Sequence, residues 1–154
     1  MMLILGIGNS LLRDEGAGIH ALNRMRSLLS GHDEIRFVDG GTLSFTLAPE
    51  VEAASHLIVF DAAKFNEAPG TVRVFEESRM DEFVSGNRKR SVHEVGLIDL
   101  MAIARLTDNL PQRRALIGIQ PRDLGWGEEP SPEVAEAIPA ACEQAMRLIE
   151  RWQS

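Results

Sequence analysis

The sequence has little of three things: cysteine, positive charge and long apolar runs. Its one cysteine, Cys142, excludes an internal disulfide and a zinc site with several cysteine ligands. Its 16 Lys and Arg residues are outnumbered by 23 Asp and Glu residues, which gives a net charge of −7. We therefore expect no nucleic-acid partner and no attachment to an anionic membrane surface.

No apolar stretch of the chain is long enough to span a bilayer, so we expect no membrane insertion. The apolar run Met2–Ile7 is short, lacks a basic lead and continues into acidic residues, unlike a secretory signal. The cytoplasm is therefore the expected compartment.

The length and composition indicate one globular domain that covers residues 1–154. This many residues can bury a proper core, and 44% of them are hydrophobic while 25% are charged. The sequence contains no internal repeat, low-complexity tract or interdomain linker.

Strand-like and helix-like segments alternate along the chain. Short apolar runs predict five strands, at Met2–Ile7, Ile35–Val38, His56–Phe60, Thr71–Phe75 and Ala115–Ile119. Apolar residues at helical spacing predict helices from Asp14 to Gly31, over Phe45–Glu52, over Glu94–Ala104, and from an N-cap at Ser131 onward. The alternation predicts an α/β fold of three layers, α/β/α, with a mostly parallel five-stranded sheet covered on both faces.

A sheet order that begins 2-1-3 would place the ends of the first and third strands side by side. Ligands bind at this switch point in doubly wound folds. Glu15 follows the first strand and Asp61 follows the third. We therefore expect both carboxylates to face one crevice.

The segment Gly6–Gly18 contains two glycines after the first strand and two acids, Asp14 and Glu15, where a helix begins. A helix N-terminus after a glycine-rich turn commonly binds phosphate. Here the acids would repel a pyrophosphate, but they suit a cation. The segment therefore indicates a metal-related site on a nucleotide-type scaffold, although an acid at a helix start is often only a cap.

His93 lies at the predicted start of a helix, where the helix dipole favours the neutral imidazole that can bind a metal. Together with Glu15 and Asp61 it would form a set of two oxygen donors and one nitrogen donor. Such a set suits borderline divalent ions such as nickel, zinc, manganese or iron, and is too small for a permanent structural zinc site. Simpler alternatives remain open: His93 as a cap or surface residue, and Asp61 as a turn residue.

Two other functions are less compatible with the sequence than a metal site. Gly6-Ile7-Gly8 matches half of a dinucleotide-binding motif, with Asp39 as the ribose-binding acid, but the third glycine position holds Leu11. A serine hydrolase is less favoured because the G-x-S-x-G elbow is missing.

Five segments in order resemble the hydrogenase maturation endopeptidases, which process the large subunit of [NiFe] hydrogenases. They span nearly the whole chain: Gly6–Gly18, Asp39-Gly40-Gly41-Thr42, Asp61-Ala62, His93-x-x-Gly96-Leu97 and Ile117–Pro121. Each motif is weak alone, but their order and spacing are specific. The family is also similar in fold to spore germination proteases, an adjacent alternative.

The resemblance implies an endopeptidase that removes a C-terminal extension from the nickel-loaded large-subunit precursor. It implies metal-binding roles for Glu15, Asp61 and His93, and it places Asp39 with them among the catalytic candidates. Nickel is expected to arrive on the substrate, held by its thiolates, and no organic cofactor is expected. The oligomeric state is open, with a monomer as the expectation.

Two mechanisms are compatible with these residues. Nickel could polarise the scissile carbonyl or lower the pKa of a water molecule. Alternatively, Glu15 or Asp39 could act as a general base.

An alternative function also stays open, an accessory metal-binding module without protease activity.

Overall fold

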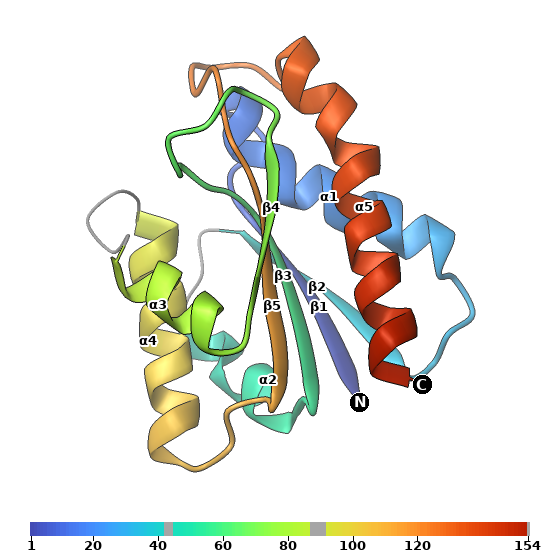
Figure 1. Ribbon diagram of the computed structural model, residues 1–154, viewed down its shortest axis with the longest axis vertical. Coiled ribbons are helices and arrows are strands. Elements are labelled where there is room, and N and C mark those ends of the chain that lie inside the picture. Colours follow the sequence, from blue (N-terminus) through green and yellow to red (C-terminus); the bar gives the residue numbers. More distant parts are fainter. Residues whose placement is uncertain (42–44, 87–91, 154) are drawn as a thin grey trace.

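A mostly parallel sheet lies at the centre of the computed structural model, between two layers of helices (Figure 1). The structure describes residues 1–41, 45–86 and 92–153, and the side chains of all these residues except 92–95. Within these ranges the strands are β1 (Met2–Ile7), β2 (Ile35–Gly41), β3 (His56–Ala62), β4 (Val72–Glu76) and β5 (Arg113–Ile119).

The strand order is β2-β1-β3-β5-β4, which confirms the predicted arrangement 2-1-3 around the first strand. Strands β1, β2, β3 and β5 pair in parallel, and β4 runs antiparallel to β5 at one edge. All residues of β1 are buried. A strand that is covered on both faces must be apolar throughout, which explains its continuous apolar run.

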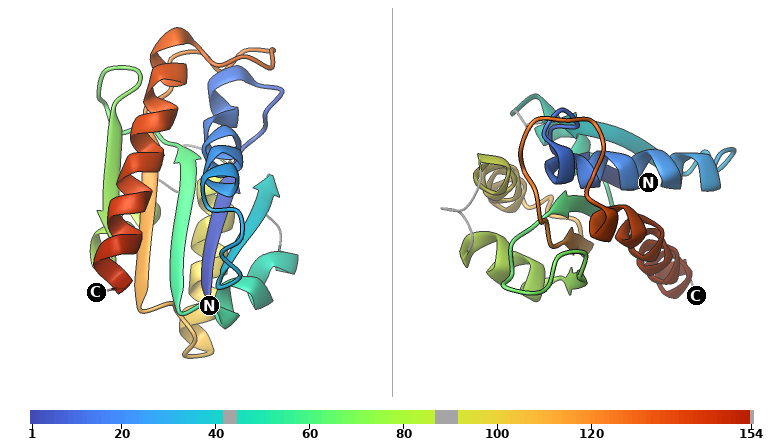
Figure 2. Two further views of the ribbon diagram at one scale, coloured as in Figure 1. Left: turned by 90° about the vertical axis from the view of Figure 1, so that its right-hand side faces the viewer. Right: turned by 90° about the horizontal axis from the view of Figure 1, so that it is seen from above.

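The helices divide between the two faces of the sheet (Figure 2). Helices α1 (Ala17–Leu28) and α5 (Pro132–Gln153) cover one face. Helices α2 (Ala48–Ala53), α3 (Ser78–Gly86) and α4 (Val92–Leu106) cover the other. The predicted three-layer α/β fold is therefore confirmed. Two short 3-10 helices, η1 (Arg13–Gly16) and η2 (Phe45–Leu47), precede α1 and α2.

The sequence did not predict α3. Only Met80 and Val84 of this helix are buried, so its apolar residues are too sparse to mark a helical face. Strand β3 also extends beyond its predicted end, so Asp61 lies inside the strand instead of after it. In the described ranges, no helix combines the length and apolar character that crossing a bilayer requires.

Candidate active site

The turn after β1 folds back onto the strand ends because glycines leave room for neighbouring backbone. Gly8 has a φ of 139°, and a Cβ there would overlap the carbonyl oxygen of Glu15. A Cβ at Gly18 would overlap the carbonyl oxygens of Ile7 and Phe60. The start of α1 is therefore packed directly on the carboxyl ends of β1 and β3.

This packing also bears on the nucleotide-binding alternative. A glycine-rich turn binds a pyrophosphate when its missing side chains leave space for the phosphate groups. Here the Glu15 carbonyl occupies the space next to Gly8. The turn is filled by its own chain, which argues against a dinucleotide site.

Glu15 and Asp61 come from two segments that are in contact, η1 and β3. Asp61 follows Phe60 in β3, pairs with Gly118 of β5, and is 1% exposed. Glu15 is half-buried. The fold thus brings both acidic positions to the end of the sheet where β1 and β3 finish. That their carboxylates face one crevice stays a prediction.

His93 is the second residue of α4, and its side chain lies outside the described part of the chain. Helix α4 runs antiparallel to β3, so its first turn lies toward the end of the sheet where β1 and β3 finish (Figure 1). Among the described side chains, no three of His, Cys, Asp and Glu gather closely enough to bind a metal ion. The role of His93 as a third ligand stays a prediction.

Asp39 is an exposed residue of β2, where it pairs with Gly6 of β1. Its Oδ1 accepts a 2.9 Å hydrogen bond from the Gly41 N–H. The Gly41 carbonyl in turn accepts a 2.8 Å bond from the Gly8 N–H. Asp39 therefore shapes the end of β2 beside the turn after β1; Thr42, the last residue of its motif, lies outside the described residues.

Asp14 has a structural role beyond the acid at a helix start that the sequence indicated. Its side chain is fully buried. It accepts bonds from the N–H groups of Arg122 (2.8 Å), Asp123 (2.8 Å) and Ser131 (2.6 Å), and from the Ser131 hydroxyl (2.8 Å). One carboxylate thus anchors both ends of the irregular loop before α5. An irregular loop needs partners for its backbone groups, but nothing in the local sequence shows that Asp14 supplies them.

The pKa of Asp14 reflects these contacts. Burial alone would raise the pKa of the carboxyl, but the N–H donors of Asp123, Ser131 and Arg122, with the Ser131 hydroxyl, lower it below its ordinary value. Asp14 is therefore held in its charged form and serves as an anchor for the loop before α5.

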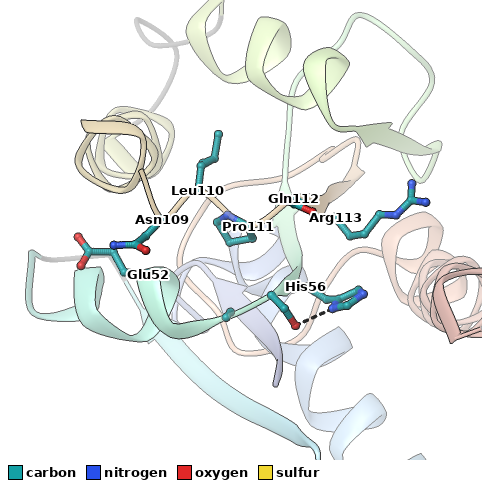
Figure 3. Close-up of a pocket in the computed structure, with 9 residues that line it drawn as sticks. Glu52, His56, Asn109, Leu110, Pro111, Gln112 and Arg113 are labelled. Atoms are coloured by element: carbon teal, nitrogen blue, oxygen red, sulfur yellow. Dashed lines mark hydrogen bonds between the residues drawn. The ribbon is translucent and has the colours of Figure 1, made fainter. Parts of the chain in front are cut away.

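A separate pocket of about 440 Å³ lies at the other end of the sheet, where β3 and β5 begin, between residues 52–56 and 109–113 (Figure 3). Ser55 Oγ lies 2.7 Å from Nδ1 of His56, but it also lies 3.1 Å from the Met1 carbonyl oxygen. The His56 ring packs against Trp152, with ring centroids 5.7 Å apart. These contacts tie the first residue to the start of β3, and we assign no catalysis to this pocket.

The fold and the acidic switch-point edge define an α/β protein whose glycine turn carries carboxylates in place of a phosphate site. Over residues 19–148 the chain matches the hydrogenase maturation protease family. It is 38% identical to the hydrogenase expression/formation protein HupD of Rhizobium leguminosarum bv. viciae, over 98% of this chain and 75% of that protein. It is 30% identical to the hydrogenase 2 maturation protease of Escherichia coli K12, over 96% of this chain and 90% of that one.

Solved structures agree with these relatives. The hydrogenase maturating endopeptidase HybD from E. coli superposes with a TM-score of 0.90 at 29% identity, over 97% of this chain and 92% of that one. The present chain therefore belongs to the hydrogenase maturation protease family, and it is a peptidase.

Proposed function

We propose that this peptidase removes the C-terminal extension of a [NiFe] hydrogenase large-subunit precursor, and that nickel carried by the precursor is the recognition element. The observation that carries the proposal is the contact between η1 and β3, which brings the acidic positions Glu15 and Asp61 to one edge. Membership of the family supports the choice of substrate. We place the reaction in the cytoplasm and expect a monomer.

The donor set fits a transient contact with a substrate-borne ion. Two carboxylates, with the imidazole of His93 as the third donor, suit nickel and leave positions open for ligands from the substrate. Such a set would hold free metal weakly. A precursor without nickel would lack the ion that these residues meet, which would delay cleavage until the metal is in place.

The residues of this chain then have separate roles. Glu15, half-buried beside the helix start, is proposed to contact the ion and to accept a proton from the attacking water. Asp61, buried in β3, is proposed as a fixed ligand, and exposed Asp39 as the alternative general base. Nickel would act as a Lewis acid that polarises the scissile carbonyl or a water molecule.

The test is incubation of the purified protein with nickel-loaded and nickel-free precursors, followed by intact-mass measurement. We expect the mature subunit from the nickel-loaded precursor alone. Equal cleavage of both precursors would contradict nickel recognition, and cleavage of neither would contradict the substrate.

Variants then assign the site. Glu15→Gln, Asp61→Asn and His93→Ala should abolish conversion, while Glu136→Gln, an exposed acid on α5, serves as the matched control. Calorimetric titration with Ni²⁺ should show weak binding by the wild type and weaker binding by the first three variants. Normal melting together with normal conversion in His93→Ala would refute its assigned role.

A further inference from the structure

Three large apolar side chains are exposed on two loops at the candidate active-site edge. They are Leu11 (51% exposed), Leu124 (38%) and Trp126 (82%). The loops bond to each other, because the Gly127 N–H donates to the Leu11 carbonyl at 2.9 Å. We call these three residues the Trp126 patch. A group of exposed apolar side chains on joined loops is the kind of surface that marks a protein–protein interaction site.

The patch is held by a rigid framework. The Arg13 N–H donates to the Gly127 carbonyl at 2.8 Å, and the Asp14 N–H donates to the Asp123 carbonyl at 3.0 Å. The Arg13 guanidinium also pairs with Asp123 at 2.9 Å. Gly127, with a φ of 148°, approaches the Arg13 side chain where a larger residue would crowd it. A loop fixed in this way loses little further entropy when a partner binds.

The framework joins the patch to the proposed site. Asp14, which anchors Arg122, Asp123 and Ser131, is the residue before Glu15. Seen from above, the loop between β5 and α5 lies beside the start of α1 (Figure 2). The loop that carries Trp126 therefore adjoins the segment that carries Glu15.

We propose that the Trp126 patch is the docking surface for the folded body of the large-subunit precursor. This inference rests on the proposed function and names the surface that selects the substrate. Trp is a residue that dominates binding energy when it enters a pocket on a partner. Glu128 and Glu129 follow Trp126 and are exposed, so the matching surface on the precursor should be an apolar pocket beside basic side chains.

The experiment compares Trp126→Ala with Leu106→Ala. Leu106 is 87% exposed at the last residue of α4, a helix that ends toward the end of the sheet where the parallel strands begin (Figure 1). It therefore controls for loss of an exposed apolar side chain. With nickel-loaded precursor, Trp126→Ala should raise KM roughly tenfold or more and leave kcat within about twofold. Leu106→Ala should match the wild type, and Trp126→Phe should recover most of the loss.

Each of the other outcomes of this experiment contradicts a particular part of the proposal. Normal KM in Trp126→Ala, with cleavage by the wild type intact, contradicts the docking surface and leaves the proposed function standing. A wild type that does not cleave the precursor contradicts the function and the proposed occupant together. A wild-type dimer that Trp126→Ala dissociates in sedimentation would show that a second copy covers the patch. If Trp126→Ala melts lower, Leu124→Ser provides the same test.

Discussion

Asp14 is fully buried and accepts four hydrogen bonds. Both of its oxygens therefore face N–H or O–H donors, and neither could be replaced by another donor. Replacing it by Asn would turn one oxygen into an NH₂ group that faces N–H donors. Leaving such buried groups unsatisfied costs about 1–3 kcal/mol each. Asp14→Asn should therefore lower the free energy of unfolding by about 2 kcal/mol or more.

The measurement is urea denaturation followed by circular dichroism. Asp33→Asn, which changes an exposed acid in the loop before β2, is the control and should unfold at the wild-type midpoint. A wild-type midpoint for Asp14→Asn would mean that the loop before α5 is held by other contacts.

Asp39 presents the opposite case, an exposed acid with one backbone bond. Asn can accept the same bond from the Gly41 N–H, so Asp39→Asn should keep the wild-type melting temperature. If Asp39 takes part in the reaction, precursor conversion should fall by about 10²-fold or more, as for loss of a general base. Conversion at the wild-type rate with normal melting would leave Asp39 as a turn residue alone.

At the scale of elements, the contact between α1 and the strand ends positions Glu15. Gly18→Ala would push a methyl group into the Ile7 and Phe60 carbonyls, which cannot move aside as a side chain could. Such overpacking costs typically about 1–3 kcal/mol. The gain in helix propensity of about 1 kcal/mol offsets part of it.

We therefore expect Gly18→Ala to melt lower and to process precursor more slowly, because α1 and η1 shift off β3. The control is Gly86→Ala at the end of α3, where a Cβ would have no neighbour within 4 Å. Thermal melting and precursor conversion check both variants. Wild-type behaviour of Gly18→Ala would contradict the tight docking of α1.

The elements that carry apolar patterns could be predicted, and those held by polar contacts could not. The strands and the inward faces of α1, α4 and α5 follow from apolar residues that the structure buries. The order 2-1-3 was assumed from the doubly wound folds, and the structure agrees with it. Helix α3 buries only Met80 and Val84, and Asp81 bonds to Arg114 of β5 at 2.6 Å. Ion pairs between distant segments leave no periodic signal in the sequence.

The same distinction holds for the candidate site. Glu15 and Asp61 could be proposed because they come from the segments at the ends of the first and third strands, which the assumed order places side by side. The role of Asp14 depends on residues more than a hundred positions away, so no local pattern reveals it. The Trp126 patch likewise depends on two loops that meet only in the folded chain.

At the scale of the whole molecule, Asp14 and Asp81 each bond to segments that are distant in the sequence. Their pKa values link the free energy of unfolding to pH. Burial raises the pKa of Asp81, but hydrogen bonds and charges from Arg114 and Arg105 lower it below the ordinary 3.8, as the N–H donors do for Asp14. A carboxyl with a lower pKa when folded binds fewer protons than when unfolded. Its contribution is present above the ordinary pKa and is lost as pH falls through the folded value.

We therefore expect the free energy of unfolding to be steady from pH 7 to about 5 and to fall steeply below about 4. Urea titrations between pH 2.5 and 7 would measure this, with Asp14→Asn showing a shallower acid slope because a carboxyl whose pKa is lowered by folding is gone. Asp33→Asn should keep the wild-type slope, since its side chain is exposed. An acid slope unchanged in Asp14→Asn would mean that this carboxyl titrates alike in both states, and that its four contacts do not hold the charged form.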